Sequence, residues 1–458
     1  MIGPPQARER FPRTFWTANT IELFERAAYY AVASFMVIFL TETLGMRPTV
    51  ATFLNGSLLW GLIYFLPIVS GTLADRFGFK RSLSLAFTLL ALGYVVMGNL
   101  HRFWPALLGR QGAAALDYTV PVVLGILLIG IGGSIVKPCI AGTVQKTTGT
   151  RATIGFGIFY MVINIGSITG RGVSYFLRTK LGIPAIFFPV ATVFALVGLI
   201  LVLFVYREPE YAAGGGTAPA APRRSVREAL AGIFTVLRSL RFVFFLLVIG
   251  CFWFIYVQLY NLVPLFLRFV DPHAPVELYT LANPIMIVAL QMLITRLVKR
   301  LSPVRSIMLG IGVTTCGMLV NILPPLLFTD IGRKVSLAGF AGLALPVAGV
   351  FLIVSIAAMA LGEMMSSPRI YEYLGSLAPK GQEGLYLGYA NLPLAIGSIV
   401  GAPIGGMLFE SHIVGPAAAG HAPHIVSMWL IVAGMGLVSM LGMLIYDRWL
   451  QYEKRTTT

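Results

Sequence analysis

The stretch that decides the fold reads ELFERAAYY, from Glu22 to Tyr30, and it lies inside an otherwise apolar segment. Two carboxylates and a guanidinium at membrane depth each cost about 2.5–3.5 kcal/mol on insertion scales, so they need partners and a use. On a helix, Glu22, Glu25, Arg26 and Tyr29 share one face at the spacing i, i+3, i+4 and i+7. We therefore predict that these side chains point together into a wet cavity. A soluble amphipathic helix is the alternative, but residues 31–40 are almost wholly apolar.

The composition of the whole chain is that of a helical membrane protein. Of its 458 residues, 57% are hydrophobic and 11% are charged, whereas soluble domains carry about 25% charged residues. At about 20 apolar residues per span, we predict about twelve spans. They begin near Phe15, Thr52, Ser82, Thr119, Ala152, Pro184, Phe242, Tyr279, Ser306, Leu343, Leu385 and Ile425.

The net charge of +16 would also suit a nucleic-acid-binding protein. The basic residues, however, collect in short loops that fall on one side of the membrane if the spans alternate from a cytoplasmic N-terminus. We therefore expect a multi-pass protein of the cell's inner (plasma) membrane with both termini in the cytoplasm, the lipid bilayer as a partner and no nucleic acid. Residues 1–13 have no apolar core, so we expect no cleavable signal peptide. The basic loops contain Arg8, Arg10 and Arg13; Lys80 and Arg81; Lys146 and Arg151; Arg223, Arg224 and Arg227; Lys299, Arg300 and Arg305; and Lys454 and Arg455.

A linker divides the chain into two halves of six spans each. Residues 212–222 read AAGGGTAPAAP, which is typical of a flexible linker, and a basic amphipathic stretch follows up to Arg241. We predict an N-terminal lobe at 1–206, a cytoplasmic linker at 207–241 and a C-terminal lobe at 242–458.

The two halves also share weak sequence echoes. The run IGSITG at 165–170 returns as IGSIVG at 396–401, and Pro138 and Pro368 recur at nearly the same separation, as do Tyr29 and Tyr260. Parallel repeats of this kind are typical of two-lobed alternating-access transporters.

The loop GTLADRFGFKR, from Gly71 to Arg81, resembles the signature loop of the major facilitator superfamily. An acid at a helix end, a tight glycine turn and paired bases can clasp a neighbouring helix terminus and release it when the lobes rock. The resemblance implies the two-lobed, twelve-helix fold of that superfamily. It also assigns a conformational role to Gly71, Asp75, Arg76, Gly78 and Arg81.

Within that superfamily, the chain resembles the proton-dependent oligopeptide transporters in both halves. The first-helix motif E-x-x-E-R is present, and matches to other helices follow in the right order. The matching residues are Glu22, Glu25, Arg26, Tyr29 and Tyr30 in span one; Tyr64 and Pro67 in span two; residues 132–138 (GGSIVKP) in span four; Phe156, Phe159, Tyr160 and residues 163–167 (INIGS) in span five; Phe252, Trp253 and Gln258 in span seven; Asn283 and Pro284 in span eight; and Glu363, Ser367 and Pro368 in span ten.

The resemblance implies a symporter that imports small peptides or peptide-like solutes together with protons. Glu22, Glu25, Arg26 and Lys137 would carry the proton coupling. Lys137 is a lone base inside the bilayer, so it needs a carboxylate, and Glu22 and Glu25 are the natural candidates. A cluster that gains or loses one proton can change its pairing. A static ion pair between spans one and four is the alternative.

The resemblance also implies a substrate site that both halves build. Glu363 would meet the amino end of a peptide, Lys137 its carboxylate, and Asn164 its backbone. Helix–helix hydrogen bonds are the alternative for Glu363 and Asn164, and ordinary packing is the alternative for the aromatic residues. The full expected set is Tyr29, Tyr30, Tyr64, Lys137, Tyr160, Asn164, Trp253, Gln258, Asn283, Glu363 and Ser367.

Two departures from the family pattern concern charges that the family usually carries. Ala33 stands where a second basic residue is usual, seven places after Arg26, and Val257 stands where an acid usually precedes Gln258. Losing both is physically coherent, because one alone would leave a buried charge unpaired at a cost of about 3–5 kcal/mol.

These departures leave a second function open, namely transport of another organic anion or a drug-like amphiphile with altered or absent proton coupling. A receptor-like protein that has lost transport would leave the intramembrane charges without a use. We expect no enzyme, because the sequence shows no nucleophile–base pair and no phosphate-binding glycine loop. The spacing of His412, His421 and His424 fits no standard ligand pattern, so we expect no metal, and we expect no cofactor. The expected partners are protons and a small solute or short peptide, and the expected state is a monomer.

Overall fold

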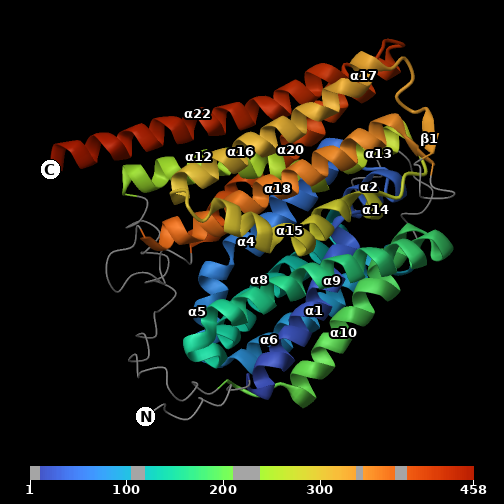
Figure 1. Ribbon diagram of the computed structural model, residues 1–458. Helices are drawn as coiled ribbons and strands as arrows, with labels where there is room; N and C mark the ends of the chain where they lie inside the picture. Colours follow the sequence, from blue (N-terminus) through green and yellow to red (C-terminus); the bar gives the residue numbers. More distant parts are fainter. Residues whose placement is uncertain (1–10, 105–118, 210–237, 337–343, 377–388, 458) are drawn as a thin grey trace.

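The computed structural model describes residues 11–104, 119–209, 238–336, 344–376 and 389–457, and it is almost entirely helical (Figure 1). Within these residues, 11 helices are long and apolar enough to cross a membrane. A twelfth span arises if α1 (Arg13–Ala33) is joined to its continuation up to Thr43, which is bent by 44°. The predicted all-α membrane protein with about twelve spans is confirmed.

The elements of the first half are α1 (Arg13–Ala33), α2 (Met36–Ile38), η1 (Phe39–Thr43), α3 (Pro48–Thr52), η2 (Phe53–Trp60), α4 (Gly61–Phe65), α5 (Pro67–Phe77), α6 (Phe79–Gly98), α7 (Leu100–Phe103), α8 (Thr119–Thr148), η5 (Gly149–Arg151), α9 (Ala152–Leu181), η6 (Ile183–Ile186), η7 (Phe187–Ala191), α10 (Thr192–Ile200) and η8 (Leu201–Val205), where η marks a π- or 3₁₀-helix. Those of the second half are α12 (Leu240–Val257), η9 (Gln258–Tyr260), α13 (Leu262–Val270), α14 (Val276–Thr280), α15 (Ala282–Val298), α16 (Pro303–Leu319), η10 (Val320–Ile322), α17 (Leu323–Leu327), β1 (Lys334–Ser336), β2 (Ala344–Pro346), α18 (Val347–Ser376), η11 (Tyr389–Asn391), α20 (Leu392–Phe409), η12 (Glu410–Val414), α21 (Gly415–Ala418) and α22 (Ile425–Thr457). The antiparallel pair β1–β2 was not expected from the sequence.

The helices gather into two bundles that follow the two halves of the chain (Figure 1). In the first, α1 packs on α9 and α6 on α8; in the second, α12 packs on α20 and α16 on α18. The bundles meet where α3 and η2 contact α20 and where α9 contacts α14 and α15. The C-terminal end of α22 lies at one end of the molecule, and β1 lies at the other, which we call the distal end. The boundary at 207–241 stays a prediction, because residues 210–237 lie outside the described part of the chain.

Glycines bring matching helices close together in the two bundles. A Cβ at Gly166 or Gly170 of α9 would collide with backbone oxygens of α1. A Cβ at Gly397 would meet the backbone of α12, and one at Gly401 would meet the side chains of that helix. Small residues at such positions let backbones approach within a membrane. The similar sequence runs at 165–170 and 396–401 therefore make equivalent contacts in the two halves. The first packs span five on span one, and the second packs span eleven on span seven.

Prolines inside two helices release carbonyl groups that hydroxyls of other helices bind. Pro138 has no N–H for the carbonyl of Ser134, and Ser70 of α5 donates to that oxygen at 2.8 Å. Pro403 likewise leaves the carbonyl of Ile399 without its helical donor, and Ser57 donates to it at 2.6 Å. The second hydrogen bond joins the two bundles.

The signature loop forms a tight turn between α5 and α6. Gly78 has a φ of +89°, a conformation that favours glycine. The carboxylate of Glu208, which follows span six, accepts the backbone N–H groups of Phe79 (3.3 Å) and Lys80 (2.7 Å). An acid at a helix N-terminus is favourable. Glu208, at the C-terminal end of the first bundle, therefore fixes this loop.

The conformational roles of Gly71, Asp75, Arg76, Gly78 and Arg81 stay a prediction. Gly71 faces Pro138 of α8, and the side chains of Arg76 and Arg81 are exposed.

Candidate functional site

The acidic and basic residues of α1 meet as the helical spacing predicts. Arg26 binds Glu25 through two hydrogen bonds, from Nε to Oε2 and from Nη2 to Oε1, the latter at 2.7 Å. Its Nε also lies 3.5 Å from Glu22 Oε1. The three side chains are only 1–3% exposed, so this conformation encloses them instead of opening them to a wet cavity.

Lys137 of α8 does not pair with these acids. Its Nζ lies 4.2 Å from the centre of the Tyr64 ring, and among the described residues no carboxylate lies at ion-pair distance from it. Arg26 sits next to both acids on the same helix and binds Glu25 through two parallel N–H groups, which is the stronger geometry. Glu22 Oε2 is buried with no hydrogen-bond partner in the described part of the chain, so one acceptor of this cluster remains open.

The second half contributes Glu363 of α18, which lies partly buried. Asn283 of α15 donates to its Oε2 at 3.2 Å, so two of the predicted substrate residues are in contact. Ser367 follows one helical turn later, and its Oγ is buried without a hydrogen bond in the described residues. Tyr160 of α9 packs against an apolar cluster of α15 and α18 that includes Met364, the residue after Glu363.

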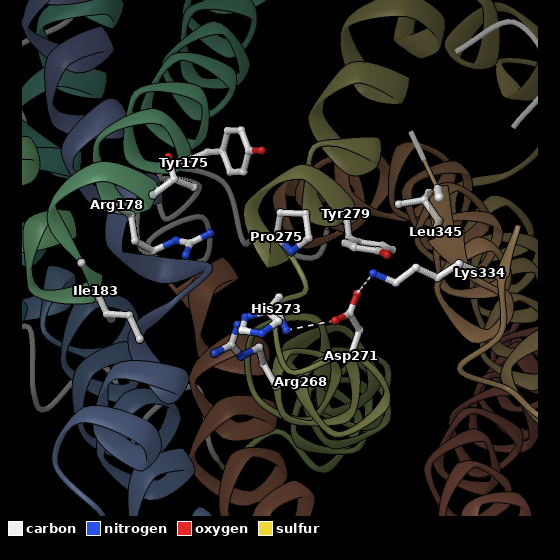
Figure 2. Close-up of a pocket in the computed structure, with 13 residues that line it drawn as sticks. Tyr175, Arg178, Ile183, Arg268, Asp271, His273, Pro275, Tyr279, Lys334 and Leu345 are labelled. Atoms are coloured by element: carbon white, nitrogen blue, oxygen red, sulfur yellow. Dashed lines mark hydrogen bonds and ion pairs between the residues drawn. The ribbon is translucent and has the colours of Figure 1, made fainter. Parts of the chain in front are cut away.

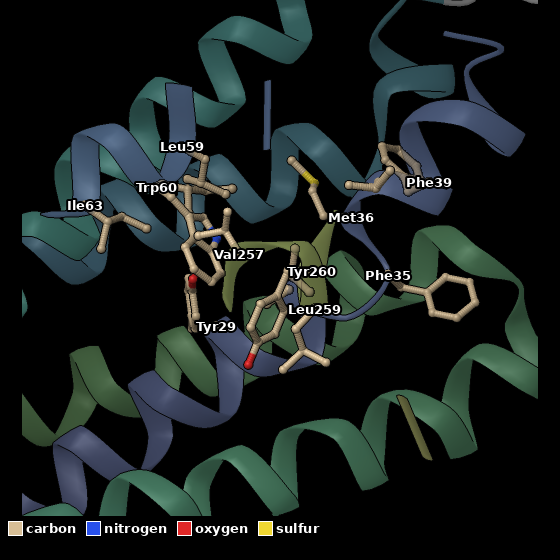
Figure 3. Packing of buried hydrophobic residues seen from close by; sticks show 14 of the residues in the cluster. Tyr29, Phe35, Met36, Phe39, Leu59, Trp60, Ile63, Val257, Leu259 and Tyr260 are labelled. Carbon is tan, nitrogen blue, oxygen red and sulfur yellow. The ribbon is translucent and has the colours of Figure 1, made fainter. Parts of the chain in front are cut away.

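A chain of aromatic rings crosses from one bundle to the other (Figure 3). Trp60 is the central ring, 6.4 Å from Tyr29 and 4.9 Å from Tyr260 between ring centres. The chain extends to Tyr30 and Tyr64 in the first half and to Tyr256 and Trp253 in the second. The predicted aromatic residues Tyr29, Tyr30, Tyr64 and Trp253 therefore share one cluster, and the sequence reasoning missed Trp60 and Tyr256.

Two predicted substrate residues are engaged in helix contacts. Gln258 is fully buried, and its Nε2 donates to the carbonyls of Phe254 at 3.0 Å and Gly401 at 2.8 Å. Asn164 donates to the carbonyl of Tyr160 at 2.9 Å within its own helix. Gln258 thus joins two helices, whereas the bond of Asn164 is not the helix–helix contact considered as its alternative. The role of both amides in substrate binding stays a prediction.

Charged residues that the sequence reasoning missed close the distal end. Arg178 of α9 donates to Glu277 of α14 from Nε to Oε1 at 2.5 Å and from Nη2 to Oε2 at 3.1 Å. Arg268 of α13 donates to the two carboxylate oxygens of Glu42 in η1 from its own Nε and Nη2. Both ion pairs join the two halves. The rule that an intramembrane charge needs a use could have found Arg178 and Glu277, since both lie in apolar spans.

A pocket of about 470 Å³ lies over these ion pairs (Figure 2). Its lining includes Arg178, Arg268 and Lys334, and Lys334 Nζ lies 3.5 Å from Asp271 Oδ2. The pocket therefore lies at the distal end, and the residues that line it do not include the rings of the aromatic chain.

The sequence model of the Major Facilitator Superfamily matches residues 20–332. The chain belongs to the Major Facilitator Superfamily. The predicted superfamily, with its transporter fold and without enzyme activity, is confirmed.

Curated relatives match one part of the chain. It is 28% identical over 196 residues to dipeptide and tripeptide permease A of Escherichia coli (strain K12), a match that covers 42% of this chain and 35% of the relative. Dipeptide and tripeptide permease B of Salmonella typhimurium is 28% identical over 197 residues, or 43% of this chain and 36% of the relative. The chain thus spans about a third of the length of these relatives.

Solved structures match nearly the whole chain in fold. A peptide transporter POT in complex with alafosfalin has a TM-score of 0.70 at 19% identity and covers 97% of both chains. A POT family transporter in complex with 5-aminolevulinic acid has a TM-score of 0.69 at 18% identity and covers 99% of both. The chain therefore shares the fold of these structures.

Proposed function

We propose that this protein is a proton-coupled symporter that imports small peptides or peptide-like solutes by alternating access. The observation that carries the proposal is the buried cluster of Glu22, Glu25 and Arg26 in one half, with Glu363 in the other half. The centre of the Tyr30 ring lies 6.0 Å from the guanidinium of Arg26 and 4.6 Å from that of Arg171, which places the Arg26 cluster beside the contact between the halves. Because both halves build one site, a monomer suffices for transport.

The charges suit a zwitterion. Lys137 would take the carboxylate of a peptide and Glu363 its amino group, and a solute that spans both would draw the halves together. Ala33 and Val257 are buried in the main apolar cluster, so we expect hydrophobic side groups to bind better than small charged ones.

Counterflow in proteoliposomes tests this function. Vesicles loaded with hydrophobic dipeptides or tripeptides should exchange them for labelled peptide, and a parallel panel of organic anions should not. Counterflow driven by the organic anions alone would overturn the peptide assignment in favour of the second function considered above. If transport is coupled to protons, removing the pH gradient should abolish net peptide uptake but leave peptide exchange unchanged.

Orientation in the membrane is a further part of this proposal. We propose that both termini and the linker lie in the cytoplasm of a cell whose inner membrane holds the protein, because the basic loops favour that side. In a variant lacking Cys139, Cys251 and Cys316, a cysteine introduced by His421→Cys at the exposed distal end should react with an impermeant reagent in intact cells. The matched Thr217→Cys, in the linker outside the described residues, should react only after lysis. The reverse pattern would show the opposite orientation.

A further inference from the structure

Arg171 of α9 is a fully buried cation at the contact between the two halves. Its exposed fraction is 0%. Its guanidinium lies 4.6 Å from the centre of the Tyr30 ring, and so adjoins the aromatic chain and the Arg26 cluster. In the described part of the chain no carboxylate lies at ion-pair distance from it. A buried charge of this kind inside a membrane is expensive and marks a functional site.

The partners of Arg171 are neutral and come from both halves. Its Nε donates to Ser34 Oγ at 3.0 Å and to Thr280 Oγ1 at 3.1 Å, and its Nη2 donates to Tyr260 Oη at 3.0 Å. Its Nη1 donates to Ser167 on its own helix. Ser34 and Ser167 belong to the first half, whereas Thr280 and Tyr260 belong to the second.

The edge formed by Nε and Nη2 distinguishes Arg171 from three arginines that pair with carboxylates. In Arg26, Arg178 and Arg268 this edge holds both oxygens of one carboxylate. In Arg171 the same edge holds two hydroxyls of the second half, Thr280 and Tyr260. When the halves separate at the distal end, Thr280 and Tyr260 leave, while Ser34 of the first half remains on Nε. A carboxylate can then take the place of Thr280 on Nε and of Tyr260 on Nη2.

We propose that Arg171 binds the carboxylate of the transported solute on its Nε/Nη2 edge when the distal end opens, in place of Thr280 and Tyr260. The proposal rests on the proposed function for the identity of the solute, and it names a residue that sets the preference for an anionic end. Closure then restores the two hydroxyls and passes the carboxylate to Lys137, whose Nζ lies 4.2 Å from the centre of the Tyr64 ring in the aromatic chain.

The test compares a ligand that has a carboxylate with the same ligand as an amide. Purified full-length protein is titrated with a dileucine peptide and with its C-terminal amide, and binding is measured by the rise in melting temperature. In wild type the free acid should bind at least about tenfold more tightly than the amide, as expected for a charge-assisted hydrogen bond. In Arg171→Gln this preference should fall by about threefold or more, and the part that remains is the contribution of Lys137.

Arg178→Gln is the matched control, since it removes a charge seven residues further along the same helix whose edge Glu277 already holds. It should change both affinities together and keep their ratio. Arg171→Gln should fold, because it replaces an unpaired buried charge by a neutral amide that can still bond Ser34 and Thr280. Arg171→Lys keeps the charge but lacks the two parallel N–H donors of the Nε/Nη2 edge, so it should retain part of the preference for the acid over the amide.

Several outcomes decide the matter. An unchanged ratio in Arg171→Gln, or an equal loss of affinity for acid and amide, would overturn the proposal and leave Arg171 as a contact between the halves. If wild type binds neither peptide, the proposed function is contradicted. The same titrations with benzoate and with benzamide, a carboxylate and its amide, then test the role of Arg171 independently of peptide binding. Absence of a preference for the acid in wild type with both ligand pairs also rules the proposal out.

Discussion

Glu25→Gln should abolish the accumulation of substrate that a pH gradient drives, while exchange of substrate across the membrane remains measurable. Glu25 is 2% exposed and accepts two hydrogen bonds from Arg26. A glutamine at this position can neither carry the charge that holds Arg26 nor take up and release a proton. Exchange persists because it needs only the loaded carrier to reorient. Uptake into proteoliposomes with an imposed pH gradient, compared with counterflow without one, measures the two activities separately.

Glu372→Gln provides the control for this prediction. Glu372 is a carboxylate with 52% exposure that pairs with Arg369 on the same helix, and such surface pairs contribute about 0–1 kcal/mol. This variant should accumulate substrate as wild type does. If Glu25→Gln also concentrates substrate up the gradient, proton coupling resides outside the α1 cluster.

The spans could be predicted from the sequence because a membrane imposes one local rule. Backbone groups in lipid must bond within their own helix, so a long apolar run is sufficient to identify a span. The bend after α1 could not be predicted this way. It falls at Ser34 and Phe35, where neither proline nor glycine marks it, and where Ser34 Oγ meets Thr280 of the other half at 3.0 Å. The strands β1 and β2 are short and polar in part, and hydropathy carries no signal for them.

The site was predictable where its residues lie on one helix. Helical spacing alone brings Glu22, Glu25 and Arg26 together. The partner of Lys137 was not predictable, because it depends on the distance between α1 and α8 and on competition from Arg26 for the acids. Arg171 was missed for a different reason: it lies in a run of small residues that reads as a helix contact, and its hydroxyl partners come from distant parts of the chain.

Arg178→Gln should open the distal end, because it leaves Glu277 as an unpaired carboxylate that is 0% exposed. Removing one partner of a buried ion pair costs about 3–5 kcal/mol. Even about 3 kcal/mol changes the balance between closed and open forms about a hundredfold. Separation of the halves relieves this cost by bringing Glu277 into contact with water from the distal pocket. Unlike Glu25→Gln, this variant should change the resting conformation rather than the coupling.

The rate at which a thiol reagent labels position 280 measures this opening. Thr280 is fully buried at the contact between the halves, so Thr280→Cys in a purified variant lacking Cys139, Cys251 and Cys316 should react slowly. Adding Arg178→Gln should raise the rate by about tenfold or more, in line with the shift in population.

Glu277→Gln should have a smaller effect on that rate, since Arg178 is 12% exposed and already lines the distal pocket, where water can solvate it. The double variant Arg178→Gln with Glu277→Gln should label more slowly than Arg178→Gln alone, because no buried charge is left unpaired. Equal rates for the single Arg178→Gln and the double variant would show that the stranded carboxylate does not drive the opening. In that case the closed distal end depends on Arg171, the Glu42–Arg268 pair and the packing of α20 on η2.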